Sequence, residues 1–424
     1  MKSILLTTTA IVAFAGAAVA DGHSGISFSG NASLGFNDDD EFGEDGFFWD
    51  SDIDVSMSAT LDNGLTANAS FELDIVDDEN SEGVSSDEFV MSLESETAGL
   101  FFGDTSFAAE TRWVGAGDME ADNFSEADGE NVIRGDFSVA GFDASVSYTV
   151  THALGDAADD DGFVNVPFDA DGVDPALVTA TEDFQDNDEF VDQLSLGVAG
   201  DFGMFSMALA YQEESVSAGV AAAADGLDDD QIDSLVQAGL YAPGVANGDF
   251  TENEIFGISG GVNFGGADIT LAYAQRNGID GADDVSSTGI QVAYPLGPVT
   301  TTVYYVSEDT GSDDEDTDDD NFGATIAYSD GPIAVTLDYD NDQGLEKVLL
   351  EGSFEVGNGF TLFAGALNEN EGDDTDFFVA AEYDLGGGAD ILVSFAEDED
   401  GDQEDEIGSD EYLPGATVEL SFAF

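Results

Sequence analysis

The chain has no cysteine, two histidines, and five Lys plus Arg against 94 Asp plus Glu in 424 residues. Without cysteine there is neither a disulfide framework nor thiol chemistry. So few positive charges argue against binding to nucleic-acid phosphates or to anionic membrane surfaces. The composition therefore predicts that the natural small partners of the chain are cations.

The sequence also lacks long apolar runs. Beyond the N-terminus no segment reaches the ~20 apolar residues of a membrane-spanning helix. At the N-terminus, Met1-Lys2 supplies a positive start, Ile4 to Val12 an apolar stretch, and Ala18-Val19-Ala20 a small-residue cleavage site. This order predicts a secretory signal peptide over residues 1–20, with residues 21–424 as the mature domain. A membrane role would then have to be carried by strands.

Strong acidity is common in disordered chains, but 42% of the residues are hydrophobic and 11% are aromatic, which is too apolar for disorder. Instead, short runs alternate apolar and polar residues. One face of the run from Ile26 carries Ile26, Phe28, Ala32, Leu34 and Phe36, and the other carries Ser27, Ser29, Asn31 and Ser33. Because strand side chains point alternately to opposite faces, each run has one apolar and one polar face, which is typical of a wall between lipid and a watery lumen.

Two kinds of connector take turns between these runs. Nine are tight and carry Gly or Asn, as hairpin turns require: residues 62–64, 97–99, 140–142, 201–203, 265–267, 296–298, 330–332, 357–359 and 386–388. The others are long and acidic, for example residues 37–50, 151–188, 213–253, 307–320 and 397–413. Nine turns joining two strands each, plus the first and last runs, count to 20 strands. We therefore predict an all-β, closed antiparallel transmembrane barrel of 16–20 strands. A soluble β-sandwich or solenoid also alternates, but nine successive hairpins with one polar face are hard to close around a dry core.

Several stretches carry a family resemblance: the opening run Ile26–Ala32, the segment Gly99–Asp104 before a long loop, the hairpin Tyr383–Asp390, and the last strand ending in Phe424. In this order they resemble the general porins of Gram-negative bacteria, particularly the Rhodobacter-type porins of alphaproteobacteria. The resemblance implies homotrimers of sixteen-stranded barrels in outer-membrane lipid that pass ions and small hydrophilic solutes by passive diffusion. It also implies that Phe424 is the assembly signal for the barrel-insertion machinery.

In that family the third long loop folds inward, and by order this is residues 105–131 here. The candidate constriction residues are Glu110, Arg112, Asp118, Glu120, Asp122, Arg134 and Asp136. The family usually sets loop acids against a basic cluster on the facing wall. After signal removal only Arg112, Arg134, Arg276 and Lys347 remain here, so an acidic ring is expected instead.

The polar faces of the strands supply further acids to the lumen. The candidates are Glu72, Asp74, Glu94, Asp338, Glu351, Glu382, Asp384 and Glu419. Carboxylates around a pore concentrate cations and repel anions, which predicts a cation preference. The alternative is that these acids only solvate a wide pore, because salt screens charges beyond about 8 Å.

Three further interpretations concern smaller features of the sequence. The acidic loops, such as residues 313–316 and 397–400, could bind Ca²⁺ or Mg²⁺ weakly, but none has EF-hand spacing, so no cofactor or metal site is predicted. Neither His23 nor His152 lies in a catalytic motif, so no enzyme and no catalytic residue is predicted. Finally, Phe107, Trp113 and Phe124 could form a binding track for a specific substrate, or anchor the loop to the wall.

Overall fold

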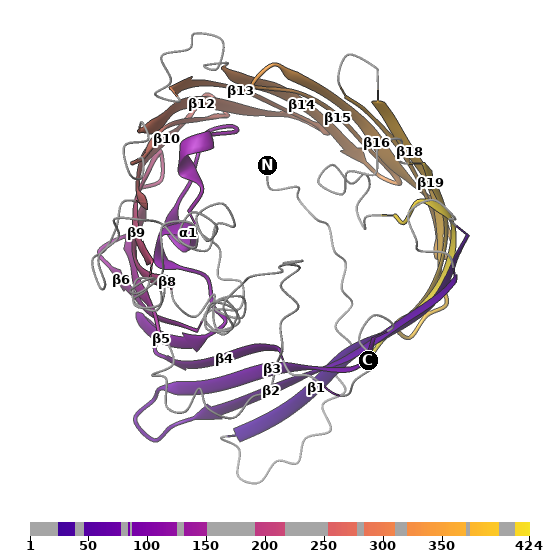
Figure 1. Ribbon diagram of the computed structural model, residues 1–424, viewed down its shortest axis with the longest axis horizontal. Coiled ribbons are helices and arrows are strands. Elements are labelled where there is room, and N and C mark those ends of the chain that lie inside the picture. Colours follow the sequence, from indigo (N-terminus) through magenta and orange to yellow (C-terminus); the bar gives the residue numbers. More distant parts are fainter. Residues whose placement is uncertain are drawn as a thin grey trace, which may run out of the picture.

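Twenty strands form one antiparallel sheet that closes on itself, because β1 pairs with both β2 and β20 (Figure 1). The computed structural model describes residues 24–38, 46–77, 84, 87–124, 131–150, 191–216, 253–277, 284–309, 320–369, 374–397 and 412–424. The predicted barrel is confirmed, and so is the count of 20 strands obtained from the turns. The sixteen strands implied by the family resemblance are wrong for this chain.

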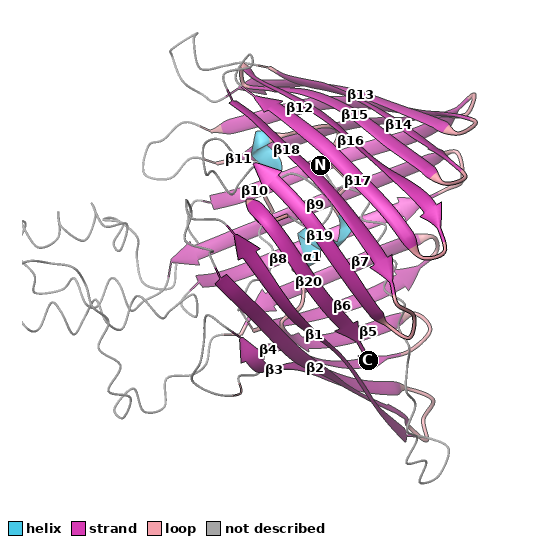
Figure 2. Ribbon diagram, turned by 90° about the vertical axis from the view of Figure 1, so that its right-hand side faces the viewer, coloured by secondary structure: helices cyan, strands magenta, loops and turns pink. Residues whose placement is uncertain are grey.

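The strands follow one another around the ring, each paired with its neighbours in sequence, and they are strongly inclined when seen from the side (Figure 2). They are β1 (Ser24–Asp38), β2 (Gly46–Thr60), β3 (Thr66–Asp77), β4 (Asp87–Glu94), β5 (Ala98–Gly103), β6 (Val132–Val139), β7 (Phe142–Thr149), β8 (Val191–Asp201), β9 (Phe205–Val216), β10 (Asn253–Phe264), β11 (Ala267–Arg276), β12 (Val285–Leu296), β13 (Val299–Asp309), β14 (Asn321–Asp330), β15 (Ile333–Asp342), β16 (Leu345–Gly357), β17 (Phe360–Glu369), β18 (Asp374–Asp384), β19 (Ala389–Glu397) and β20 (Gly415–Ala423). Two short helices, α1 (Ala108–Arg112) and η1 (Glu120–Asp122), lie between β5 and β6.

The outward face of the barrel is apolar. In β1, Ile26, Phe28 and Leu34 leave more than half of their surface exposed, whereas Asn37 on the other face is completely buried. The register continues this face into the next strands, since Phe28 lies opposite Val55 and Val55 lies opposite Phe71. A closed wall with exposed apolar side chains outside suits lipid and does not suit a soluble sandwich, whose apolar faces would pack on each other.

All nine predicted tight connectors are hairpin turns, and they lie on one rim, which we call the short-turn rim. In one of them, Asn358 and Gly359 have φ values of 57° and 81°, the left-handed conformation that two-residue hairpins need. The opposite rim departs from the predicted alternation, because Gln343 and Gly344 join β15 to β16 by another tight turn. The long acidic loops therefore do not occupy every position on that rim.

Among the described residues, neither helix has the length and apolarity needed to cross a membrane. The predicted signal peptide, His23, His152 and the acidic run 313–316 fall outside the described residues, as do residues 398–400 and 125–130.

Candidate functional site in the barrel lumen

After β5 the chain turns into the barrel, and residues 104–124, here called the inward loop, run along the inner wall. Within this loop α1 contacts β7, β8 and β9, and η1 contacts β10, β11 and β12. Figure 1 shows α1 inside the ring beside β8 and β9. The loop therefore covers one side of the lumen and leaves the other side without this cover.

Polar wall side chains hold the loop backbone. Three loop N–H groups donate to wall serines: Ala108 to Ser147 Oγ (2.8 Å), Ala109 to Ser195 Oγ (2.7 Å) and Ala121 to Ser287 Oγ (2.9 Å). All three serines are buried. The Asn321 amide donates to the carbonyl oxygen of Asp118 at 3.1 Å. These bonds satisfy backbone groups that the loop takes out of water, where an unpaired group would cost ~1–3 kcal/mol.

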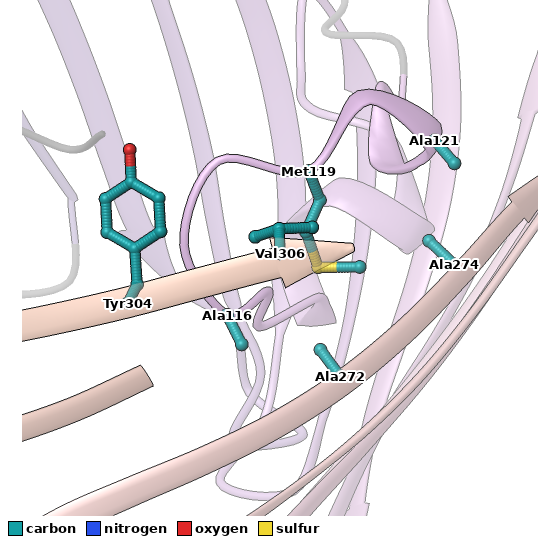
Figure 3. Close-up of a cluster of buried hydrophobic side chains, with 7 residues drawn as sticks. All are labelled: Ala116, Met119, Ala121, Ala272, Ala274, Tyr304 and Val306. Carbon is teal, nitrogen blue, oxygen red and sulfur yellow. The ribbon is translucent and has the colours of Figure 1, made fainter. Parts of the chain in front are cut away.

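An apolar cluster packs the distal half of the loop against the wall. It consists of Ala116, Met119 and Ala121 from the loop, Ala272 and Ala274 from β11, and Tyr304 and Val306 from β13 (Figure 3). All seven are buried although they lie on the lumenal side of the barrel. Their burial on the watery face therefore stabilises the inward position of the loop.

Three wall glycines make room for this close approach. A Cβ at Gly197 would lie 2.1 Å from the Ala108 carbonyl oxygen, and one at Gly289 would lie 2.1 Å from that of Ala116. At Gly257 it would meet the Trp113 ring at 2.5 Å. Because two of the clashing atoms are backbone, even a methyl group would force the loop off the wall.

Gly197→Ala is therefore expected to displace α1 and to destabilise the barrel by ~1–3 kcal/mol, the usual cost of overpacking. Urea unfolding of the detergent-solubilised protein would measure this change. Gly260→Ala in β10 is the matched control, because its Cβ would meet only the Ser206 carbonyl oxygen at 3.7 Å, an ordinary contact. Equal stability of the two variants would contradict the close seating of the loop.

A partly buried ionic cluster fixes the start of the loop. Arg134 Nε lies 3.2 Å from Asp136 Oδ1, and Arg112 Nη2 lies 3.7 Å from Asp136 Oδ2. Arg134 Nη1 also donates to the Ser106 carbonyl oxygen (2.5 Å) and to Thr111 Oγ1 (3.2 Å), and its guanidinium stacks 4.8 Å from the centroid of Phe101. Both arginines are thus paired at the wall, so they are poor candidates for the basic half of a transverse field.

The loop acids lie further along, close to the wall. Loss of water around the carboxylate raises the pKa of Asp122 to about 6, although the Trp113 indole N–H donates to its Oδ2 at 2.8 Å. Burial also raises the pKa of Asp118 and of Glu120. Glu110, on α1, is half-buried. Six of the seven predicted constriction residues therefore divide into an ionic cluster at the start of the loop and an acidic group beyond it, while Glu110, on α1, belongs to neither group.

The aromatic residues of the loop are anchors. Phe107 is completely buried and Phe124 is 7% exposed, and the Trp113 ring packs 5.4 Å from that of Phe124. Of the two roles left open by the sequence, anchoring fits this burial, because a binding track needs accessible ring faces.

The predicted lumen-lining acids lie on the strand face opposite the exposed apolar side chains, by register. Glu72 faces Asp54, Asp74 faces Asp52, Asp338 faces Thr325, Glu351 faces Thr336, Asp384 faces Asp390, and Glu382 and Glu419 both face Leu392. Glu94 accepts a hydrogen bond from the Asn68 amide at 2.8 Å. The register thus places Glu72, Asp74 and Asp384 each opposite an aspartate. The effect of these acids on permeation stays a prediction.

Sequence reasoning missed the wall residues that accept hydrogen bonds from the loop or allow its close approach, namely Ser147, Ser195, Ser287, Gly197, Gly257 and Gly289. A signal was available, since a serine stands two residues before a glycine in β8 and in β12 (Ser195 and Gly197, Ser287 and Gly289).

The chain is also similar to a known protein family and to several solved structures. The profile of a family described as Gram-negative porin matches residues 7–240 and 216–403. Among solved structures, the chain is similar to engineered variants of the Rh. blastica porin. Two of them show 12% and 13% sequence identity with TM-scores of 0.41 and 0.42, over 95% of this chain and 100% of theirs. No curated protein matches the sequence significantly.

Proposed function

This chain belongs to the Gram-negative porin family, and from that premise we propose that its lumen passes cations and small hydrophilic solutes in preference to anions. As a porin it is a general diffusion channel of the outer membrane and not an enzyme, as the sequence predicts. The proposal concerns the charge preference of that channel.

The observation that carries the proposal is the state of the basic residues. Among the described residues, Arg112 and Arg134 both pair with Asp136, and Lys347 Nζ lies 2.8 Å from Glu369 Oε1. Asp136 and Glu369 thus offset two of these three positive charges, and Arg276 at the end of β11 is the fourth base of the described chain, so the lumenal acids clearly outnumber the bases. The acids of the inward loop and of the strands therefore set a negative potential along the pore. A potential of one kT enriches monovalent cations about 3-fold and depletes anions about 3-fold.

The test is the reversal potential of the purified channel in a planar lipid bilayer under a KCl gradient. At pH 7.5 we expect a potential of the sign that cation permeation produces, growing as the salt is diluted because screening weakens. A potential near zero or of the opposite sign would overturn the proposal.

The same measurement at pH 5 should give a smaller cation preference. The raised pKa of Asp122, about 6, means that this carboxylate is charged at pH 7.5 and mostly neutral at pH 5, and Asp118 and Glu120 shift in the same direction. Unperturbed aspartates, with a pKa near 3.9, would stay charged over this range. A reversal potential unchanged between pH 7.5 and pH 5 would exclude the loop acids as its source.

The finer features of assembly stay predictions. They are the homotrimer, recognition of Phe424 by the barrel-insertion machinery, the constriction by residues 105–131, and weak Ca²⁺ or Mg²⁺ binding by the acidic loops. The Phe424 N–H donates to the Gly30 carbonyl oxygen at 2.8 Å, and its ring is 60% exposed beside that of Phe422. That exposure leaves the ring accessible to a binding partner.

A further inference from the structure

The inner wall formed by β16–β19 carries an apolar patch, although the lumenal face of a porin wall is expected to be polar. The inner apolar patch has a buried base of Leu367, Phe378, Ala380 and Ala396, against which the half-buried Leu349, Phe363 and Leu392 pack. The ring of Tyr412, which precedes β20, lies 4.8 Å from that of Phe378 and is buried with it.

The register shows that this patch faces the lumen. The neighbours of its residues in sequence, Leu350, Leu362, Val379 and Val393, are exposed on the lipid side. By strand alternation the patch residues therefore point inward. Figure 1 places β16, β18 and β19 across the lumen from α1. The patch thus belongs to the wall that the inward loop does not cover.

Carboxylates border the patch, both on neighbouring strands and further along the same strand. Asp338 lies opposite Leu349, Asp376 lies opposite Leu367, and Glu382 and Glu419 both lie opposite Leu392. Glu351 follows Leu349 on the same face of β16. The basic residue of this wall, Lys347, forms an ion pair with Glu369. Apolar surface surrounded by negative charge is complementary to a molecule with an apolar body and a positive group.

We propose that the inner apolar patch binds amphipathic organic cations, such as alkylammonium ions, as they pass through the channel. The apolar body lies on Leu349, Phe363 and Leu392, and the ammonium group lies toward Glu351 or Glu382. The inference rests on the proposed cation preference, which brings such molecules into the lumen. Inorganic cations gain nothing from the patch, and amphipathic anions are repelled by its border.

Single-channel recording with three probes tests this inference: hexylammonium, methylammonium and hexanoate. Hexylammonium should reduce the current saturably, with a dissociation constant about 10-fold or more below that of methylammonium, because five further methylene groups leave water. Hexanoate has nearly the same chain with the opposite charge and should block no better than methylammonium.

Two lumenal variants locate the site. Phe363→Ser and Leu392→Ser, on different strands, should each weaken the hexylammonium block several-fold and leave the reversal potential in KCl unchanged. Thr270→Ala is the matched control, since Thr270 lies on the lumenal face of β11, opposite Gln291 and outside the patch, and it should leave the block unchanged. Glu382→Gln should weaken the hexylammonium block and leave the small effect of hexanoate unchanged or larger.

Each outcome separates the two proposals. If hexylammonium binds no tighter than methylammonium while the reversal potential still favours cations, the patch is covered by the protein's own chain and this inference alone fails. If hexanoate blocks as well as hexylammonium, the patch binds apolar molecules without regard to charge, which also overturns it. An anion-favouring reversal potential instead overturns the proposed cation preference.

Discussion

Replacing Arg134 with alanine should destabilise the protein by ~1.5–3 kcal/mol, because it removes charged hydrogen bonds to the start of the loop and leaves Asp136 with Arg112 beside it but without its nearer partner. Arg134 is 9% exposed and ties the Ser106 carbonyl, Thr111 and Asp136 together at the root of the inward loop. Its loss should free the start of the loop, so that single-channel recordings show larger and noisier conductance. Urea unfolding of the detergent-solubilised barrel would report the stability change.

Arg276→Ala is the matched control for this variant, since it removes the same side chain and charge from a half-buried position at the end of β11. It should cost ~1 kcal/mol or less, as partly exposed charges usually do. Arg134→Lys keeps the charge but loses the planar fork, and should fall between the two. If Arg134→Ala had the same stability and the same single-channel current noise as Arg276→Ala, the ionic cluster would have no role in holding the loop.

Neutralising the three acids of the distal loop should cause the largest change in selectivity. In the variant Asp118→Asn, Glu120→Gln, Asp122→Asn the side-chain shapes are kept, and the amide oxygen that Asp122→Asn introduces can still accept from the Trp113 indole. If the three charges contribute one kT to the pore potential, the cation-to-anion permeability ratio falls about 7-fold. Reversal potentials in dilute KCl, where screening is weak, measure that ratio.

The control makes the same change in net charge away from the loop. Asp62→Asn, Asp330→Asn and Glu355→Gln neutralise three exposed acids near the short-turn rim. This variant should leave the permeability ratio close to that of the unmodified channel at 0.1 M salt, where the Debye length is about 10 Å. Equal effects of the two triple variants would mean that the overall charge of the protein, and not the loop, governs selectivity.

Much of the barrel could be predicted from the sequence because its signals are local. Alternation in β1 follows from the period of a strand, and turns such as Asn358-Gly359 are marked by residues that tolerate positive φ. Counting such turns gave the correct number of strands, whereas the family resemblance gave a wrong one. The predicted alternation of short and long connectors failed in one place, at Gln343-Gly344, where a tight turn lies on the rim expected to carry long loops.

The wall surface that the inward loop packs against and the inner apolar patch could not be predicted, because both depend on which residues of different strands lie side by side. Gly197, Gly257 and Gly289 are 60 and 32 residues apart in sequence, yet all three face the inward loop. Likewise, Leu349 lies beside Leu367 only through the register of β16 and β17. A single sequence gives the period of each strand but not its offset from the next.

The tight turn at Gln343-Gly344 also has a consequence for how the barrel assembles. Together with the turns on the short-turn rim, it makes β14 to β17 (residues 321–369) a meander without any long excursion of the chain. Contacts between residues close in sequence form fastest, because little chain entropy is lost in closing short loops. We therefore expect sheet formation to start in this meander, and the pairing of β20 with β1 to close the barrel last.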